Sequence, residues 1–302
     1  MGRNSPIEWT HHTFNPWWGC TKISPSCKYC YAERWSKRTG SKLWGATSGR
    51  RFFGERHWHE PIVWNRLAEK HHKRRRVFCA SMADVFEDRP DLIQWRRRLW
   101  QLIENTPWLD WLLLTKRVEN LKEMIPWQSI WPHNVWLGTT VENQKMAQKR
   151  IPILLQYPAI VRFVSCEPLL GPVELKQWLI HSDEKGTGNR TSATIYAGTN
   201  GTRINWVIAG GESGHYARPT NPSWVRDIRD QCMASNTPFH FKQWGCWRPL
   251  EKGAKPISKT TCFEDTNGKS VTLLRMGKKA AGRELDGRTW SEMPIYEFDK
   301  GR

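Results

Sequence analysis

Three cysteines near the N-terminus constrain this chain more than any other feature. Cys20, Cys27 and Cys30 form a CxxxxxxCxxC run inside the segment TFNPWWGCTKISPSCKYCYAE, residues 13–33. A short turn lets Cys27 and Cys30 converge, and the longer loop that carries Pro25 lets Cys20 return to the same centre. No fourth cysteine follows at ligand spacing. A closed zinc site needs four protein ligands, whereas three thiolates on a [4Fe-4S] cluster leave one iron open. The run therefore favours an iron–sulfur site with a free coordination position.

Two other interpretations of the cysteines stay open. A zinc ion completed by one of four histidines is the first, with His11, His12, His57 and His59 as the candidates. Three unrelated buried thiols are the second. An open iron is where S-adenosylmethionine binds in radical SAM enzymes, which usually show a CxxxCxxC spacing. This sequence has six residues where that pattern has three.

The charge of the chain predicts a polyanionic partner. The 302 residues carry a formal net charge of +18, which favours nucleic acid or an acidic membrane surface over a neutral partner. The alternative is a solvated basic face on a soluble protein. Twenty tryptophans among the cations favour nucleic acid, because aromatic rings stack on unpaired bases.

The sequence has neither a long apolar run nor the apolar core of a signal peptide, so we expect a cytoplasmic protein without a membrane partner. Eight cysteines in a reducing compartment indicate metal ligands and buried thiols rather than disulfides. Cys79, Cys166 and Cys232 lie in apolar segments and are predicted core residues.

Short apolar runs alternate with helical periods from residue 77 onward, which predicts an α/β fold with parallel strands. A first strand is expected at residues 14–18. The later runs are at residues 77–81, 111–115, 135–139, 161–165, 206–210 and 239–242. Helical stripes are expected at residues 31–37, 92–103, 118–125 and 224–232, the last with Asn221 as its cap and Pro222 in its first turn. The alternation is typical of a partial (β/α) barrel or an open parallel sheet.

The barrel is expected over residues 1–245. A surface insertion is predicted at about 177–203, which is rich in Gly, Ser, Thr and Asn. A small C-terminal extension at 246–302 is expected to pack on the barrel.

Polar residues follow almost every predicted strand, and parallel strands would direct them into one cavity. We expect this cavity to bind S-adenosylmethionine through Ser81, Asp84, Lys116, Arg117, Thr139, Glu142, Asn143, Glu167, Gly210, Gly211 and Glu212. Asp84 would accept from the amino group, Lys116 or Arg117 would offset the carboxylate, and Glu142 or Asn143 would hold the ribose. Gly210 and Gly211 would let the backbone approach the adenine. For each residue singly, a helix cap or an internal ion pair is the alternative.

Two further segments are candidate nucleic-acid contacts. Residues 40–61 show no helical or strand period, and this loop offers Arg50, Arg51 and Trp58 for gripping a nucleotide strand; a lid packed on the barrel explains it equally well. The tail phrase GKKAAGRELDGRTW adds a cluster suited to phosphate or to a solvated turn, made of Lys278, Lys279, Arg283 and Arg288.

Several phrases in this order resemble a family of phage and prophage proteins related to radical SAM enzymes. They are FNPWWGCTKISPSCKYCYAE, FCASMADVFE, LLLTKR, WLGTTVEN, FVSCEPLLGP, WVIAGGESG, FKQWG and GKKAAGRELDGRTW. The resemblance implies a partial (β/α) barrel of the radical SAM type with a [4Fe-4S] cluster on the three cysteines. The chain is also distantly similar to spore photoproduct lyase, which repairs DNA.

Three functions follow as hypotheses. The first is a radical SAM enzyme that modifies or repairs a nucleic acid, with DNA favoured over RNA. The second is a nucleic-acid-binding protein whose metal only shapes the loop. The third is radical chemistry on a peptide or a small molecule.

Overall fold

The computed structural model describes residues 2–127, 130–179, 194–195, 203–250, 258–264 and 268–296. These residues cluster into two compact units. Unit 1 holds residues 1–139 and 157–162, and unit 2 holds residues 140–156 and 163–302. Each unit is built around parallel strands with helices between them.

Unit 1 contains the first four strands of the chain. They are β1 (His12–Thr13), β2 (Arg75–Cys79), β3 (Leu109–Thr115) and β4 (Val135–Thr140), and each pairs with the next in parallel. Their inward side chains are fully buried, among them Val77, Trp111 and Leu113. Strands buried on both faces need continuous apolar runs, which is why the sequence signal for β2 to β4 is strong.

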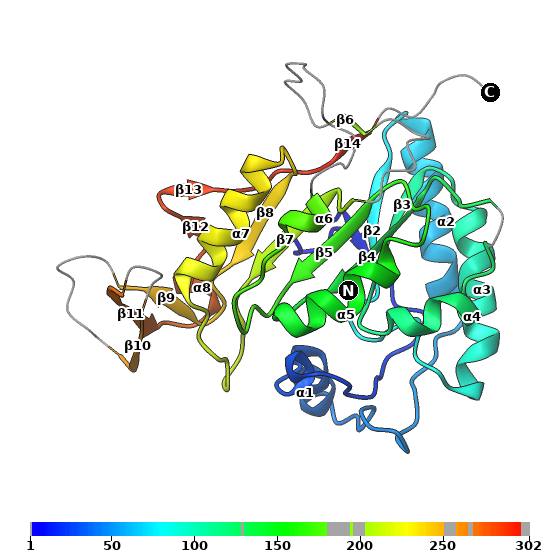
Figure 1. Cartoon of the computed structure of the whole chain (residues 1–302). Coiled ribbons are helices and arrows are strands. Elements are labelled where there is room, and N and C mark those ends of the chain that lie inside the picture. Colours follow the sequence, from blue (N-terminus) through cyan, green and yellow to red (C-terminus); the bar gives the residue numbers. More distant parts are fainter. Residues whose placement is uncertain are drawn as a thin grey trace. The chain divides into compact units, whose positions relative to one another are not determined.

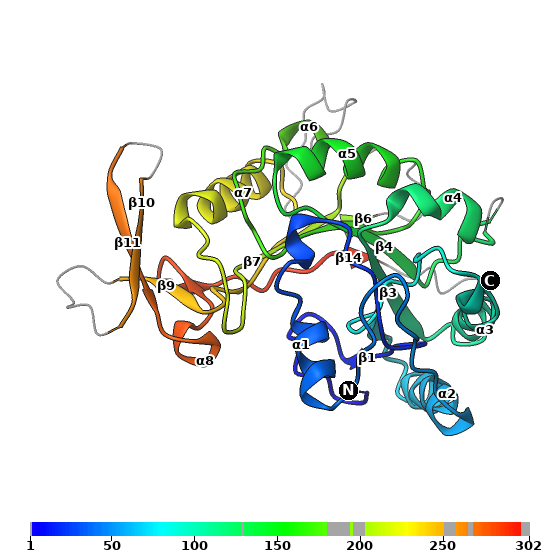
Figure 2. The same cartoon turned by 90° about the horizontal axis from the view of Figure 1, so that it is seen from below.

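The helices of unit 1 are α1 (Tyr31–Arg38), α2 (Glu55–Lys70), α3 (Ile93–Glu104) and α4 (Leu121–Met124). Short 3₁₀ turns precede three of them, at Pro25–Cys27, Pro90–Leu92 and Val118–Asn120. The helix α2 packs on β2 and β3. Figure 1 shows α1, drawn in blue, set apart from α2 and α3, and Figure 2 shows α2 and α3 beside one another.

Unit 2 contains the parallel strands β5 (Arg162–Cys166, whose first residue falls in unit 1), β7 (Trp206–Gly210) and β8 (Phe239–Gln243). Its helices are α5 (Gln144–Leu154), α6 (Lys176–Leu179) and α7 (Pro222–Ala234). Asn221 caps α7 by accepting a hydrogen bond from Ser223 N at 3.0 Å, and Pro222 occupies the first turn, as the sequence predicted.

The tail of unit 2 forms small sheets after Gly245. Strands β9 (Trp247–Pro249), β10 (Thr260–Glu264) and β11 (Ser270–Arg275) pair antiparallel in the order β10-β11-β9. A short helix α8 (Lys278–Ala281) and the hairpin β12 (Glu284–Leu285) with β13 (Arg288–Thr289) follow. The strand β14 (Ile295–Tyr296) pairs in parallel with β6 (Thr194–Ile195).

The predicted fold class is confirmed. Within each unit the strands pair in parallel, and strands alternate with helices along the chain, as in a partial (β/α) barrel. The expected domain boundary after Gly245 stays a prediction. Most of the expected insertion at about 177–203 lies outside the described residues.

Two local predictions were wrong. The first strand is His12–Thr13 rather than residues 14–18. The last third of the expected loop at 40–61, residues 55–61, belongs to the helix α2. The buried stripe of α2 runs through Trp58, Pro61, Trp64, Asn65 and Ala68, so a proline and an asparagine stand where apolar residues would reveal a helical period.

No helix in the described ranges is long and apolar enough to cross a membrane.

Candidate functional site

The cysteine loop joins β1 to α1 and is anchored to the end of β2 in unit 1. Gly19 N donates to Met82 O at 3.0 Å, and Tyr31 Oη donates to Ser81 O at 2.7 Å. Asn15 accepts from Met82 N at 2.7 Å and donates to Ser81 Oγ at 3.1 Å. Ser81, expected to bind a cofactor, therefore lies beside this loop and holds it in place.

Gly19 lets the loop pass close to a second segment. Its φ is +117°, and a Cβ added there would stand 2.5 Å from Leu43 O. Only glycine fits such a position without moving the backbone. The next residue, Cys20, then forms a bridge with Trp44.

The three thiols take different places in the loop. Cys27 ends the 3₁₀ turn, and Cys30 is the residue immediately before α1. All three are free cysteines of intermediate exposure. Cys30 N donates to Cys27 O at 3.4 Å, so the two residues share one tight turn, as the CxxC spacing predicts.

Arg117 connects Cys20 to the end of β2. Its Nη1 atom lies 3.5 Å from Cys20 Sγ and 3.0 Å from Asp84 Oδ2, and its Nη2 atom donates to Thr21 O at 2.6 Å. Asp84 also accepts from Thr115 Oγ1 at 2.7 Å and from Lys116 N at 3.1 Å. The structure thus brings Asp84, Lys116 and Arg117 together with Cys20, as expected from their places after β2 and β3.

A second buried ion pair supports this network. Arg50 Nη2 lies 2.7 Å from Glu87 Oε1, and Arg50 Nε lies 3.0 Å from Glu87 Oε2. Glu87 Oε1 also lies 3.9 Å from Arg117 Nη2. A row of alternating charges therefore lies beneath the cysteine loop, in the order Arg50, Glu87, Arg117 and Asp84. Burial strengthens such pairs, and removing one member leaves its partner charged in a medium of low dielectric constant.

The electrostatic surroundings of the three thiols differ. Burial raises the pKa of Cys20 to about 12, although Arg117 acts in the opposite direction. Burial also raises the pKa of Cys30, with Lys116 and backbone hydrogen bonds opposing it. At Cys27 burial is outweighed by Lys116 and by hydrogen bonds at Ile23 and Ser24, so its pKa is lowered. Cations from the end of β3 therefore favour the thiolate at all three sulfur atoms.

The three thiols of the loop are the donor type that iron–sulfur clusters take. Within the described ranges, no group of three or more His, Cys, Asp or Glu side chains is arranged to hold a metal ion.

The histidines considered as zinc ligands have other contacts. His11 Nδ1 accepts from Arg76 N at 2.9 Å, His12 stacks on Trp64 with ring centroids 4.5 Å apart, and His57 Nε2 lies 2.9 Å from Asn15 O. His59 lines a pocket between α2 and α3.

The remaining predicted cofactor residues lie at strand ends, most of them in unit 2. Glu142 pairs with Arg150 at 2.8 Å, and Asn143 caps α5 by accepting from Met146 N at 3.1 Å. Thr139, at the end of unit 1, donates to Thr115 O at 2.8 Å. Glu142 and Asn143 therefore have the two roles, internal ion pair and helix cap, that were the alternative for single residues.

Glu167 and the two glycines form a second group in unit 2. Glu167 Oε2 lies 2.9 Å from Lys242 Nζ, and its Oε1 accepts from Gln243 at 3.3 Å. A Cβ at Gly210 would stand 3.3 Å from the Glu167 carboxylate, and one at Gly211 would stand 2.1 Å from Trp244 O. Close packing of two strand ends therefore explains Gly211. Glu212 is held by Arg218 at 2.6 Å.

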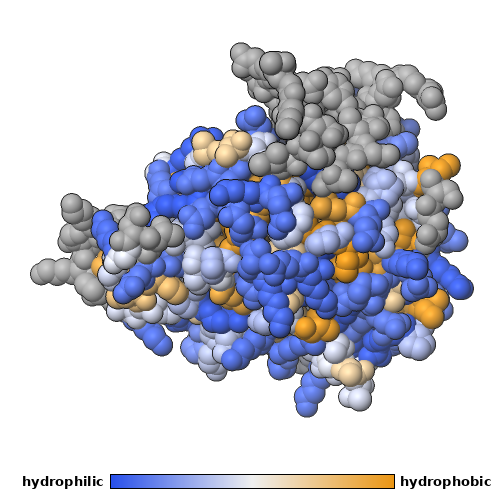
Figure 3. Space-filling model, in the orientation of Figure 1, coloured by the Kyte–Doolittle hydropathy of each residue, from blue (hydrophilic) through white to orange (hydrophobic). Residues whose placement is uncertain are grey.

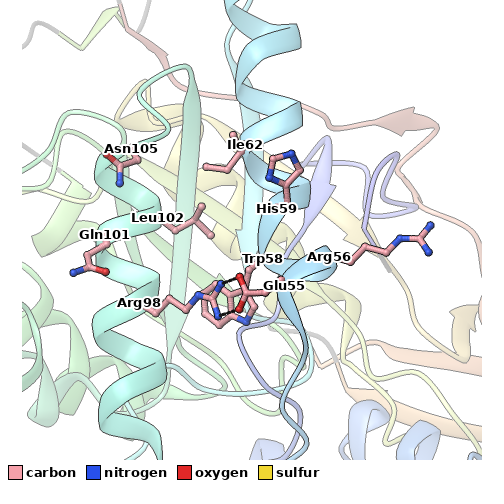
Figure 4. Close-up of a pocket in the computed structure, with 9 residues that line it drawn as sticks. All are labelled: Glu55, Arg56, Trp58, His59, Ile62, Arg98, Gln101, Leu102 and Asn105. Atoms are coloured by element: carbon pink, nitrogen blue, oxygen red, sulfur yellow. Dashed lines mark hydrogen bonds and ion pairs between the residues drawn. The ribbon is translucent and has the colours of Figure 1, made fainter.

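Two of the expected nucleic-acid contacts are in the interior instead. The side chain of Arg50 is fully buried against Glu87, and Trp58 is 3 % exposed. Figure 4 shows why: Trp58 lies on α2, and Arg98 from α3 covers its ring while pairing with Glu55. The burial of Arg50 and Trp58 corrects the expectation that they grip a nucleotide strand.

Arg51 and the tail cations keep exposed positions. The guanidinium of Arg51 lies 4.8 Å from the Trp18 ring centroid and 5.6 Å from that of Phe53. Lys278 and Lys279 are exposed on α8, and Arg288 lies 4.1 Å from the Trp290 centroid. Arg283 is half-buried, and its Nη2 atom donates to Ser291 Oγ at 2.8 Å.

Sequence reasoning missed Glu87 and Asn15 as parts of this site. Glu87 comes three residues after Asp84, and this spacing of two carboxylates after a buried strand was the available signal. Asn15 lies inside the cysteine segment itself, but no pattern of spacing marks an asparagine that binds a backbone N–H.

A comparison with family models shows where the chain belongs. The model of a family described as protein of unknown function (DUF5131) matches residues 4–294. The chain belongs to this family. No curated protein and no solved structure matches it.

The DUF5131 match spans the cysteine loop, both units and almost all of the tail. The phrases that carry the resemblance noted in the sequence all lie inside it. The three cysteines, the Asp84–Arg117 pair and the lysines of α8 therefore all belong to the part of the chain that defines the family match.

Proposed function

We propose that this DUF5131 protein is a radical SAM enzyme whose [4Fe-4S] cluster is held by Cys20, Cys27 and Cys30. The observation that carries the proposal is the position of the cysteine loop. Three free thiols follow β1 at the carboxyl end of parallel strands, and the cations Lys116 and Arg117 act on them from the end of β3. Parallel α/β folds bind their ligands at that end.

A cluster held by the three cysteines would, with S-adenosylmethionine and a one-electron reductant, supply hydrogen-abstraction chemistry. The chain's own residues provide the surroundings. Lys116 offers a cation for the methionyl carboxylate, and Asp84 offers a carboxylate for its amino group. Arg117 holds Asp84 in place through the 3.0 Å contact. The resemblance to radical SAM proteins, and the distant one to spore photoproduct lyase, supports the same chemistry.

A nucleic acid, with DNA favoured, is the substrate class we propose. The support is the formal net charge of +18 and the aromatic group beside the cysteine loop. In that group, Trp18 contacts Trp35 with ring centroids 4.9 Å apart and Phe53 at 5.3 Å, under the guanidinium of Arg51. Most described residues on the face in Figure 3 are hydrophilic. Trp35 is exposed, Trp18 and Phe53 are half-buried, and aromatic rings beside cations suit unpaired bases. A cytoplasmic location in a phage-related setting is part of this proposal.

Metal analysis tests the cluster and separates it from its alternative. After anaerobic reconstitution with iron and sulfide, we expect about four irons per chain. One tightly held zinc and no stable iron would point to a nucleic-acid-binding protein with a structural metal.

A salt titration tests the substrate class. Affinity for single-stranded DNA should fall steeply with salt, and Lys278→Ala with Lys279→Ala should reduce the slope by about two. If the protein retains a cluster but lacks DNA affinity, the substrate is a peptide or a small molecule.

A further inference from the structure

A basic pocket lies at the edge of the unit 1 sheet opposite the cysteine loop. Its lining includes His12 and Arg75, which are the first residues of β1 and β2. The cysteine loop and Ser81 follow the other ends of these strands. The five residues of β2 span about 17 Å, so the pocket is separate from the proposed cluster site.

The lining of this pocket is cationic without a counter-charge. Among the described residues that line it are two arginines and three histidines but no carboxylate: Arg3, Arg75, His11, His12 and His71. The nearby Arg74 differs, because it pairs with Asp110 at 2.6 Å. The pocket between α2 and α3 also differs, because its Arg98 pairs with Glu55 at 2.5 Å (Figure 4).

Burial and the neighbouring arginines lower the pKa values of two histidines in this lining. Burial, together with Arg75 and Arg3, lowers the pKa of His12 to about 4. Burial, Arg76 and Arg75 lower the pKa of His11 to about 4 as well. Both rings are therefore neutral at pH 7. Their Nδ1 atoms accept backbone N–H groups, at 2.9 Å for His11 and 3.4 Å for His12, which leaves Nε2 as an N–H donor.

The pocket also has an apolar side and room for more than a single ion. Trp64 is 3 % exposed and stacks on His12 at an interplanar angle of 15°, whereas Leu67, 36 % exposed, is the open apolar side chain of the lining. The pocket volume is about 410 Å³, in the range of small-molecule sites.

We propose that this pocket binds the phosphate of a nucleotide. Arg3 and Arg75 pair with the phosphate oxygens, the neutral histidines donate to them, and the apolar side of the pocket at Leu67 receives the nucleoside. Arginine suits phosphate because its planar fork of N–H groups matches two oxygens at once. The nucleotide is either a free mononucleotide or one unit of a nucleic acid. This site does not depend on the proposed cluster chemistry.

Calorimetry on the full chain tests the pocket with four probes: inorganic phosphate, adenosine 5′-monophosphate, adenosine and a single-stranded 12-mer DNA. Arg75→Ala and Arg3→Ala should each weaken phosphate-bearing probes by about tenfold or more. Arg97→Ala is the matched control, because it removes the same charge from an exposed position on α3. Adenosine should bind far more weakly than its monophosphate.

The probes distinguish the two sources of phosphate. Arginine-dependent binding of the monophosphate marks a free-nucleotide site. Arginine-dependent binding of the 12-mer without monophosphate binding marks a nucleic-acid contact. A second readout is the His12 ring in NMR spectra, whose pKa should rise when phosphate binds. The proposal is wrong if Arg75→Ala and Arg3→Ala weaken the affinity for every probe no more than Arg97→Ala does. Arg3 is exposed, so its variant tests the pocket even if Arg75→Ala fails to fold.

Discussion

The guanidinium of Arg117 contacts the sulfur of Cys20, with 3.5 Å between Nη1 and Sγ. The same Nη1 atom lies 3.0 Å from the carboxylate of Asp84, and both charged side chains are less than 10 % exposed. A residue from the end of β3 therefore connects the first cysteine of the motif to the residues that follow β2. This contact ties the cysteine loop to the sheet.

Removing Arg117 should destabilise the protein strongly. Arg117→Met leaves Asp84 buried without a counter-charge, which costs about 3–5 kcal/mol of unfolding free energy. The double variant with Asp84→Asn should recover part of this loss, because it removes the unpaired charge. Urea unfolding followed by far-UV circular dichroism measures both. The control is Arg97→Ala, whose side chain is exposed and whose effect should be within about 0.5 kcal/mol. Equal stability of the Arg117 and Arg97 variants would contradict the buried pair.

Cysteine substitutions should separate the motif from the other thiols. Cys20→Ala, Cys27→Ala and Cys30→Ala should each abolish stable iron retention after reconstitution, because a cluster with two protein thiolates is poorly held. Cys262→Ser is the matched control: this free cysteine is exposed on β10 and lies outside the motif. Iron and sulfide assays measure the result. If Cys262→Ser lost iron while the three motif variants retained it, the cluster would not be held by the motif cysteines.

Stability should fall as the pH decreases from about 6.5 to about 4, because the folded state holds His11 and His12 neutral. The unfolded chain takes up protons below pH 6.5, whereas the folded chain does so only near pH 4, so acid favours unfolding in this window. Urea midpoints at pH 7, 6 and 5 should decrease. The double variant His11→Asn with His12→Asn should flatten this dependence. If the double variant kept the same pH dependence of stability, His11 and His12 would not be its cause.

Gly211 should tolerate no side chain. A Cβ there would stand 2.1 Å from the carbonyl oxygen of Trp244, so Gly211→Ala forces the backbone apart and should cost about 1–3 kcal/mol or more. Gly49→Ala is the control, since no atom lies within 4 Å of a Cβ at that position. Thermal unfolding compares the two. Similar melting temperatures would mean that the strand ends are not packed so closely.

The sequence revealed the strands better than the helices. Strands such as β3 are buried on both faces, and their apolar runs stand out from the polar loops around them. The helix α2 escaped prediction because Pro61 and Asn65 lie on its buried face. The missed helix α5 buries Arg150, which reads as a surface residue until its partner Glu142 is known.

The candidate site was predictable in part for a similar reason. Residues that follow parallel strands meet at one edge, which is enough to group Asp84, Lys116 and Arg117 with the cysteine loop. The interior location of Arg50 was not predictable, because an arginine in a basic loop looks exposed until a buried acid is found for it. That acid, Glu87, lies 37 residues away in the chain. Pairings of that range depend on the fold rather than on local sequence.

The most direct test of the proposed function is the product of reductive cleavage. The anaerobically reconstituted protein is mixed with dithionite and S-adenosylmethionine, and 5′-deoxyadenosine is quantified by liquid chromatography with mass spectrometry. We expect 5′-deoxyadenosine from the wild-type chain and from Cys262→Ser, and none above background from Cys20→Ala, Cys27→Ala or Cys30→Ala. Absence of 5′-deoxyadenosine from a wild-type sample that holds its full complement of iron would contradict the account.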